Sequence, residues 1–187
     1  MQSGTGHLCT ANGGGVLWGA GVAGNGYGGI QVTAFLSTFV NKVDRKGRVS
    51  VPAPFRAALS DAPYQGIIAY PSMTDQAIDA FGRATLEELN RRRHERTMED
   101  GDFERALLGG DSLVDTIMAM AHELPFDGEG RIVLPQILTD AAGITDRAAF
   151  VGRGSRFQIW APDAFDNHQK SAVAALRGRL GRDGGGP

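Results

Sequence analysis

Short stretches of alternating apolar and polar residues, separated by turn residues, run from about residue 35 to residue 160. Around Val49 the order is apolar, polar, apolar, the pattern of a half-buried β-strand. Pro52 ends this strand because proline has no amide hydrogen for the ladder, and Pro54 fits the first turn of a helix. The sequence therefore predicts a strand, an Asp-x-x-Gly turn at 44–47, a strand at 49–51, a short helix at 55–59 and strands at 66–70 and 77–81.

The same series of elements occurs twice. The segment from Val43 to Leu59 matches the segment from Phe126 to Ala142 at a constant offset. If a short insertion in the first copy is allowed, the downstream parts also correspond, with Ile67-Ile68 opposite Phe150-Val151. The second copy is expected to have strands at 149–152 and 156–160 with a turn at 152–155. The matched pairs are Asp44 with Asp127, Gly47 with Gly130, Arg48 with Arg131, Pro52 with Pro135, Val49 with Ile132, Phe55 with Leu138, Ile78 with Phe157, and Phe81 with Trp160.

Helical patterns lie between the copies and after the second one. We expect helices at 85–97 and 111–121, interrupted by Asp100-Gly101-Asp102, and a third helix at about 162–180. Because neither copy has enough core to stand alone, we expect an α+β fold in which the two β units pack on each other with pseudo-two-fold symmetry. The expected domains are a disordered glycine-rich extension (1–34), a first unit (35–83), a helical connector (84–121), a second unit (122–165), and a C-terminal helix with a disordered tail (166–187).

The glycines of the first 34 residues include Gly19-x-Gly21-x-x-Gly24, which matches the dinucleotide fingerprint, but no strand precedes it and no helix follows. An enzyme that uses this motif is therefore the weakest hypothesis for function. The sequence leaves open whether residues 1–34 are translated. No histidine has a Ser, Cys or acid at catalytic spacing, so we expect no catalytic residue and no cofactor.

Composition restricts the function classes further. The chain has 187 residues, a formal net charge of −2 and a pI near 6.1, which argues mildly against a globally basic nucleic-acid binder. The single cysteine, Cys9, cannot form an internal disulfide, and no Cys/His cluster has zinc-site spacing. No segment approaches the roughly 20 apolar residues of a membrane span. We expect a cytoplasmic protein with no metal and no membrane partner.

The repeated segments resemble a known family. VDRKGRVSVPAPFR, LPFDGEGRIVLPQILTDAAGI and VGRGSRFQIWAPDAF are similar to the bacterial MraZ regulators over roughly Phe35 to His168. The resemblance implies two tandem AbrB-like, swapped-hairpin units, each with a D-x-x-x-R motif. It also implies rings of subunits, association with the nucleoid, and binding to G-rich direct repeats in the promoter of the division and cell-wall gene cluster. The same fold, as a single unit, also serves in antitoxins, whose partner is a protein toxin. The alternative function is therefore an antitoxin-like interaction module without specific DNA binding.

Local charge suggests how DNA would be bound. Together with Asp44, the cations Lys42, Arg45, Lys46 and Arg48 give the first hairpin a charge of +3. A two-stranded ribbon fits the major groove, and Arg can bind guanine O6 and N7 with two parallel bonds. Arg45 or Arg48 would suit G-rich repeats, and Lys46 would contact phosphate. For Arg45 and Lys46 the alternative is a bare solvated turn.

The repeated acids and glycines have a structural interpretation. Asp44 and Asp127 begin turns and are expected to stabilise them, because an acid repels phosphate. Gly47 and Gly130 end those turns. Arg48 and Arg131 either hold the fold by pairing with these acids or contact DNA, and the sequence does not decide between the two roles.

The second copy differs in charge. The run from Glu123 to Arg131 is net −2, so we expect the first copy to face DNA and the second mainly to support assembly. The basic run from Arg91 to Arg96 is either a second DNA contact or a solvated helix face with Glu87, Glu88 and Glu95 as partners. Strand alternation places Phe157 and Trp160, together with Phe165, in the core or in a subunit contact.

Overall fold

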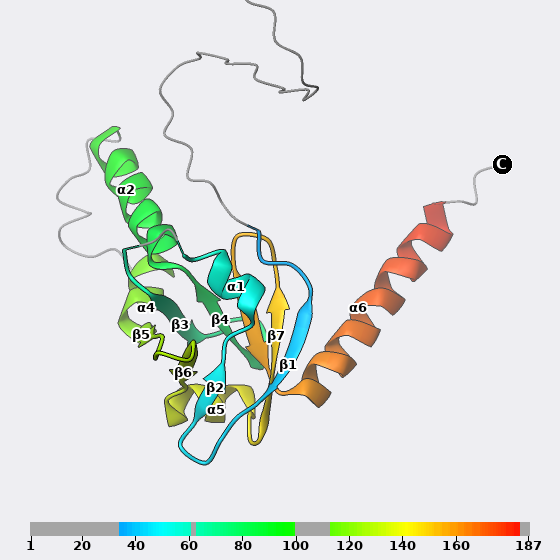
Figure 1. Ribbon diagram of the computed structural model, residues 1–187. Helices are drawn as coiled ribbons and strands as arrows, with labels where there is room; N and C mark the ends of the chain where they lie inside the picture. Colours follow the sequence, from blue (N-terminus) through cyan, green and yellow to red (C-terminus); the bar gives the residue numbers. More distant parts are fainter. Residues whose placement is uncertain (1–33, 61–62, 100–112, 184–187) are drawn as a thin grey trace, which may run out of the picture. The chain divides into compact units, whose positions relative to one another are not determined.

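A computed structural model describes residues 34–60, 63–99 and 113–183 (Figure 1). The expected disorder of residues 1–34 lies outside the described residues apart from Ala34, and so do the glycine motif at 19–24 and the break at 100–102. The fold is mixed α+β, as predicted. Its strands are β1 (Thr38–Lys42), β2 (Arg48–Ser50), β3 (Gly66–Pro71), β4 (Ala77–Phe81), β5 (His122–Pro125), β6 (Arg131–Val133), β7 (Arg147–Gly152) and β8 (Phe157–Trp160).

Six strands form one antiparallel sheet in the order β1-β7-β8-β4-β3-β5, and β2 pairs with β6 in a second, two-stranded sheet (Figure 1). The first strand of each copy thus pairs with the other copy: β1 lies beside β7, and β5 lies beside β3. The order is symmetric about the central pair, in which Ile78 faces Ile159 and Ala80 faces Phe157. The two repeats are therefore intertwined AbrB-like units with exchanged hairpin strands and pseudo-two-fold symmetry.

The strand register corrects one part of the repeat alignment. The Val43 N–H donates to Asp146 O, and the equivalent Phe126 N–H donates to Gln65 O, both at 2.7–2.9 Å. Gln65 therefore corresponds to Asp146, and Ile67 corresponds to Ala148 rather than to Phe150. The predicted alignment of β3 with β7 was wrong by two residues. A shift of two preserves the alternation of inward and outward side chains, so the apolar pattern alone cannot detect it.

The main core lies between one face of the large sheet and the small sheet with two short helices, α1 (Ala53–Ala57) and α5 (Gln136–Ala142). Both helices begin directly after a proline, Pro52 or Pro135. Phe55 on α1 and its counterpart Leu138 on α5 are at most 1% exposed. Leaving such side chains in water costs about 1.5–3 kcal/mol each, so these pairs are a main source of stability.

The other helices cover the opposite face of the sheet, because side chains alternate along each strand. Ile68 and Phe81 pack against α2 (Arg83–Glu99) and α4 (Leu113–Met120) through side chains such as Leu86 and Ile117. Trp160 packs against Phe165 at the start of α6 (Pro162–Asp183). Phe157, Trp160 and Phe165 are buried, which confirms the predicted core role. Helix α6 continues three residues beyond the expected end, and residues 184–187 are not among the described ones. No helix in the described ranges is long and apolar enough to cross a membrane.

Candidate nucleic-acid interface

The turn of the first copy is held together by Asp44. Its Oδ1 accepts the backbone N–H groups of Lys46 and Arg48, at 2.8 and 2.9 Å. Its Oδ2 accepts the Nε–H of Arg48 at 2.6 Å. Gly47 closes the turn with φ +75°, a left-handed conformation that side-chain-bearing residues rarely adopt. These are the hydrogen bonds expected of a turn-stabilising carboxylate and of an arginine that braces the same turn.

The turn of the second copy repeats this geometry almost atom for atom. Asp127 Oδ1 accepts the backbone N–H groups of Glu129 and Arg131, both at 2.9 Å, and its Oδ2 accepts Arg131 Nε–H at 2.7 Å. Gly130 has φ +73°. We call this shared arrangement of acid, glycine and arginine the Asp-Arg staple. It explains the D-x-x-x-R spacing, because only the fourth residue after the acid returns both its N–H and its guanidinium to the carboxylate.

The staple keeps both acids ionised. Backbone hydrogen bonds from Arg48, followed by its side-chain bond, lower the pKa of Asp44 below 3.8. The corresponding backbone and side-chain bonds from Arg131 lower the pKa of Asp127 to about 2. Hydrogen bonding to Asp127 in turn raises the pKa of Arg131. Each staple is therefore a fixed ion pair at neutral pH.

Between the staple residues the first copy carries two cations, Arg45 and Lys46, whose side chains are exposed. Among the described residues, no carboxylate forms a salt bridge with either side chain. These charges stand at the tip of a tight turn rather than on a two-stranded ribbon. Strands β1 and β2 share one bridge, Val43 with Val49, because β2 pairs with β6 instead. The prediction of a two-stranded β1–β2 ribbon is therefore wrong in detail. The element that presents Arg45 and Lys46 is the turn alone.

The sheet register adds a cation that the sequence did not reveal. Lys42, the last residue of β1, is paired directly with Arg147, the first residue of β7, and both are exposed. Directly opposed residues of antiparallel strands project on the same face with Cβ atoms about 4.5–5.5 Å apart. Arg147 lies a hundred residues further along the chain, so only the exchange of strands between copies brings it to the first turn. We call Lys42, Arg45, Lys46 and Arg147 the basic face.

The same positions in the second copy are not basic. With Arg48, Asp44 and Asp146 included, the surroundings of the first turn hold five cations against two carboxylates, a formal +3. The equivalent positions of the second copy hold Arg131 against two carboxylates, a formal −1. Arg56 from the first copy lies against Gly130 and donates to Val51 O at 2.6 Å, which brings the second turn near neutrality. These equivalent positions around the second turn are Pro125, Asp127, Gly128, Glu129 and Arg131 from the second copy, with Gln65 and Gly66 from the first.

The two turns lie at opposite ends of the β2–β6 ladder. Gly47 O accepts the Leu134 N–H at 2.9 Å, and Gly130 O accepts the Val51 N–H at 3.0 Å. In this antiparallel pair Val49 faces Ile132 at the centre. Because a strand rises about 3.3 Å per residue, the turns are separated by roughly 10 Å or more along the ladder. The two turns are therefore distinct surfaces, and a ligand at one need not touch the other.

Three arginines of the most basic run in the sequence, on α2, form ion pairs. Arg91 pairs with Glu88 at 2.6 Å and with Glu95, and Arg92 pairs with Glu88 at 2.5 Å. These pairs lower the pKa of Glu88 to about 2, chiefly through the Arg91 and then the Arg92 hydrogen bonds. Arg93 pairs with Asp115 on α4. This geometry favours the solvated-face interpretation of the run over a DNA contact.

No group of three or more His, Cys, Asp or Glu residues is placed to hold a metal ion in the described ranges.

The sequence singled out five cations as DNA contacts: Lys42, Arg45, Lys46, Arg48 and Arg131. The structure places Arg45 and Lys46 at the tip of the first turn, pairs Lys42 with Arg147 beside it, ties Arg48 into the staple, and sets Arg131 at the other end of the ladder.

Comparison with known proteins agrees with this architecture. A family model described as "MraZ protein, putative antitoxin-like" matches residues 117–177. Proteins named transcriptional regulator MraZ from Rickettsia akari (strain Hartford) and Rickettsia felis are each 43% identical over 141 residues, which cover 75% of this chain and 90% of each relative. The Rickettsia bellii protein of that name is 43% identical over 139 residues, covering 74% and 88%. On this likeness, which covers about three quarters of its residues, the chain belongs to the MraZ family.

Proposed function

We propose that this protein is a transcription regulator that binds specific double-stranded DNA through the basic face of its first copy. The observation that carries the proposal is the contrast between two turns of the same backbone geometry, of which only the first presents cations without carboxylate partners among the described residues. The names of the relatives support regulation of transcription. We also propose, from the family resemblance, that the targets are G-rich direct repeats in the promoter of the division and cell-wall gene cluster and that the protein acts at the nucleoid.

Each cation has a proposed role that follows from its placement. Arg45 at the tip reads guanine, because its guanidinium can donate two parallel bonds to O6 and N7. Lys46, Lys42 and Arg147 contact phosphates and supply affinity without sequence information. Arg48 acts mainly by holding the turn, since its Nε–H is committed to Asp44.

Several subunits acting together would supply the affinity that one small turn lacks. A ring of subunits facing several repeats raises affinity through effective concentration. The second copy would suit contacts between subunits, because it exposes larger apolar side chains at two positions where the first copy has a serine and a proline. Val133 and Ile137 are 54% and 63% exposed, and the equivalent positions hold Ser50 and Pro54. In the β2–β6 ladder Val133 lies opposite Arg48, at the end of the ladder nearer the first turn, and exposed apolar side chains there would suit a contact with another subunit.

The DNA proposal is tested by fluorescence anisotropy on a duplex carrying closely spaced G-rich direct repeats. Arg45→Ala combined with Lys46→Ala removes two charges from the basic face, and we expect affinity to fall by about 100-fold, since a bidentate base contact is worth about 1–3 kcal/mol. The matched control, Arg91→Ala with Arg92→Ala, removes two paired charges from α2 and should change affinity by less than about 3-fold. Equal losses in the two double variants would refute the assignment.

The assembly proposal is tested by light scattering on the full chain. Val133→Ser with Ile137→Ser should lower the subunit number, whereas Arg45→Ala with Lys46→Ala should leave it unchanged. A parent protein that is monomeric at micromolar concentration would remove the multivalent part of the proposal.

A second candidate function is an antitoxin-like interaction module. The wording of the matching family model and the exposed apolar side chains of Val133 and Ile137 favour it. In that case a stoichiometric protein partner would co-purify, the repeat duplex would not be bound, and Glu129→Lys would weaken the protein complex rather than strengthen DNA binding.

A further inference from the structure

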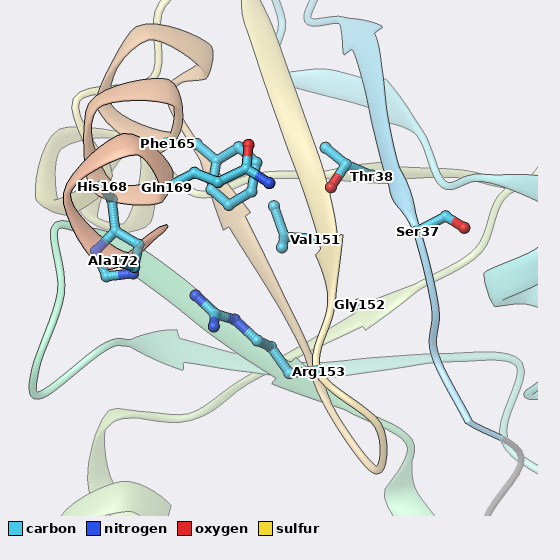
Figure 2. A pocket seen from close by; sticks show the side chains of 9 residues that line it. All are labelled: Ser37, Thr38, Val151, Gly152, Arg153, Phe165, His168, Gln169 and Ala172. Carbon is cyan, nitrogen blue, oxygen red and sulfur yellow. The ribbon is translucent and has the colours of Figure 1, made fainter. Parts of the chain in front are cut away.

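A groove of about 270 Å³ opens between the β1–β7 edge of the sheet and helix α6 (Figure 2). Its floor is apolar, formed by Val151 and Phe165, both at most 7% exposed. Polar groups surround this floor, among them Thr38 from β1 and Gln169 from α6. Arg153 extends from the end of β7 toward His168 on α6 (Figure 2). The groove is separate from the basic face, which lies at the other end of the same β1–β7 ladder.

Arg153 is fixed by a buried amide rather than by an acid. Gln158, only 2% exposed, accepts the Arg153 Nε–H at 3.1 Å and the Trp160 indole N–H at 3.1 Å. Its own amide donates to Asp75 Oδ2 at 3.2 Å. The orientation of the Gln158 amide is therefore set by hydrogen bonds at both its oxygen and its nitrogen. It binds the Arg153 guanidinium through Nε–H alone. No carboxylate in the described residues forms a salt bridge with Arg153, so its terminal N–H groups remain available to a ligand.

Arg156, on the same β7–β8 turn, shows that this arrangement is not a general property of the turn. Its Nε lies 3.4 Å from Asp79, a residue only 7% exposed, so its charge has a partner. Nothing in the sequence distinguishes Arg153 from Arg156, because both flank the turn. The structure separates them into one arginine paired with an acid and one held over an apolar groove.

The rim of the groove is also preformed. Ser37 has φ +72°, a left-handed conformation that costs a non-glycine residue about 1–2 kcal/mol. Its carbonyl accepts the Gly152 N–H at 2.9 Å, which ties the start of β1 to the end of β7. On the opposite side the His168 ring packs against the Trp160 ring, with centroids 4.9 Å apart and an interplanar angle of 45°. Strained backbone held by its surroundings is concentrated at binding sites.

We propose that this groove is a binding site for a small carboxylate that carries an apolar group. The planar guanidinium of Arg153 would take the two carboxylate oxygens with parallel N–H bonds, the geometry for which arginine is suited. Val151 and Phe165 would cover the apolar part, and Gln169 would donate to a carboxylate oxygen. A single arginine matches the single charge of a carboxylate better than the double charge of phosphate, and the volume limits the ligand to the size of a small aromatic or branched acid.

The test uses the full chain and three probes of graded chemistry: benzoate, benzamide and inorganic phosphate, each titrated by calorimetry at constant pH and ionic strength. We expect saturable binding of benzoate, with benzamide and phosphate each at least about 10-fold weaker, because a charge-assisted bond and an apolar contact are both needed. Benzamide binding as tightly as benzoate, phosphate binding more tightly than benzoate, or no saturation with benzoate would each overturn the proposal.

Two variants locate the site. Arg153→Gln should weaken benzoate by at least about 10-fold, whereas Arg156→Gln, which removes an equal charge from the same turn, should leave benzoate affinity within 2-fold. Thermal unfolding of both variants controls for folding. Equal weakening by the two substitutions would show that benzoate responds to surface charge only and would overturn the assignment to the groove. DNA binding by the basic face is not required for either result.

Discussion

The turns at 44–48 and 127–131 have the same hydrogen bonds but opposite formal charges. In both, an aspartate accepts two backbone N–H groups and the Nε–H of an arginine four residues later. The two positions between the staple residues hold Arg45 and Lys46 in one copy and Gly128 and Glu129 in the other. The comparison teaches that the D-x-x-x-R motif builds the turn, whereas the variable positions inside it decide what the turn can bind.

The residues that surround the two turns also differ between the copies. Strand exchange adds Arg147 to the first turn, and it brings Arg56 against Gly130 of the second. Duplication of one unit thus produced two chemically different surfaces on a shared backbone. The following predictions test whether the staples are equivalent in stability and whether the surfaces differ in function.

The largest effect on stability is expected from the turn glycines. A Cβ at Gly47 would lie 2.8 Å from the backbone O of Leu134, whereas the three atoms nearest to a Cβ at Gly130, all at 2.6 Å, belong to the flexible side chain of Arg56. Both substitutions carry the left-handed cost of about 1–2 kcal/mol, but the backbone collision adds to it at Gly47. Urea unfolding should show Gly47→Ala less stable than Gly130→Ala, with Gly128→Ala, which meets open space, near the parent. Equal losses at Gly47 and Gly130 would mean that the collision is relieved without cost.

A smaller effect is expected from Arg147, the cation contributed by the second copy to the first turn. If it contacts a phosphate, Arg147→Ala should reduce the slope of log affinity against log salt by about 1. The comparison variant is Arg83→Ala, because Arg83 lies 3.5 Å from Glu87 and from Glu123 and is placed near the second copy's strand β5. Arg83→Ala should leave the salt slope unchanged, and a slope that responds equally to both variants would argue against the basic face.

The smallest effect is an acid-dependent loss of stability from the staples. The folded pKa of Asp127 is about 2, below the ordinary aspartate value of 3.8, so its contribution to stability is fully present above about pH 4 and is lost as the pH falls toward 2. The difference in unfolding free energy between the parent and Asp127→Asn should therefore shrink over that range. Asp44→Asn should behave in the same direction, because the pKa of Asp44 is also lowered. A difference that is constant from pH 5 to 2 would show that the staple charge does not contribute.

The sequence predicted the elements well because local chemistry specifies them. The prolines, the Asp-x-x-Gly turns and the period-two alternation of residues such as Val49 and Ile132 act over a few positions. The equivalence of Ile78 with Phe157 and of Phe55 with Leu138 also agrees with the structure. These local patterns do not indicate which distant strands pair with each other. The sequence suggested that β1 and β2 form a ribbon, and only the three-dimensional fold shows that β2 pairs with β6.

The candidate site was predicted in part for the same reason. The cations Lys42, Arg45 and Lys46 are close in sequence, and their grouping is visible without a structure. Arg147 and the groove around Arg153 depend on strand exchange and on a buried glutamine, which no local pattern indicates. The alignment of β3 with β7 failed because a two-residue shift leaves the inward and outward faces unchanged.

The central claim, that the first turn and not the second binds DNA, is tested most directly by exchanging the turn residues. Arg45→Gly with Lys46→Glu gives the first copy the turn sequence of the second, and Gly128→Arg with Glu129→Lys makes the reverse change at a position with open space. The account predicts that the first exchange lowers affinity for a direct-repeat duplex by roughly 100-fold or more, while the second leaves it equal to or above the parent value. Parent-like binding by the first exchange, with its thermal unfolding unchanged, would contradict the account.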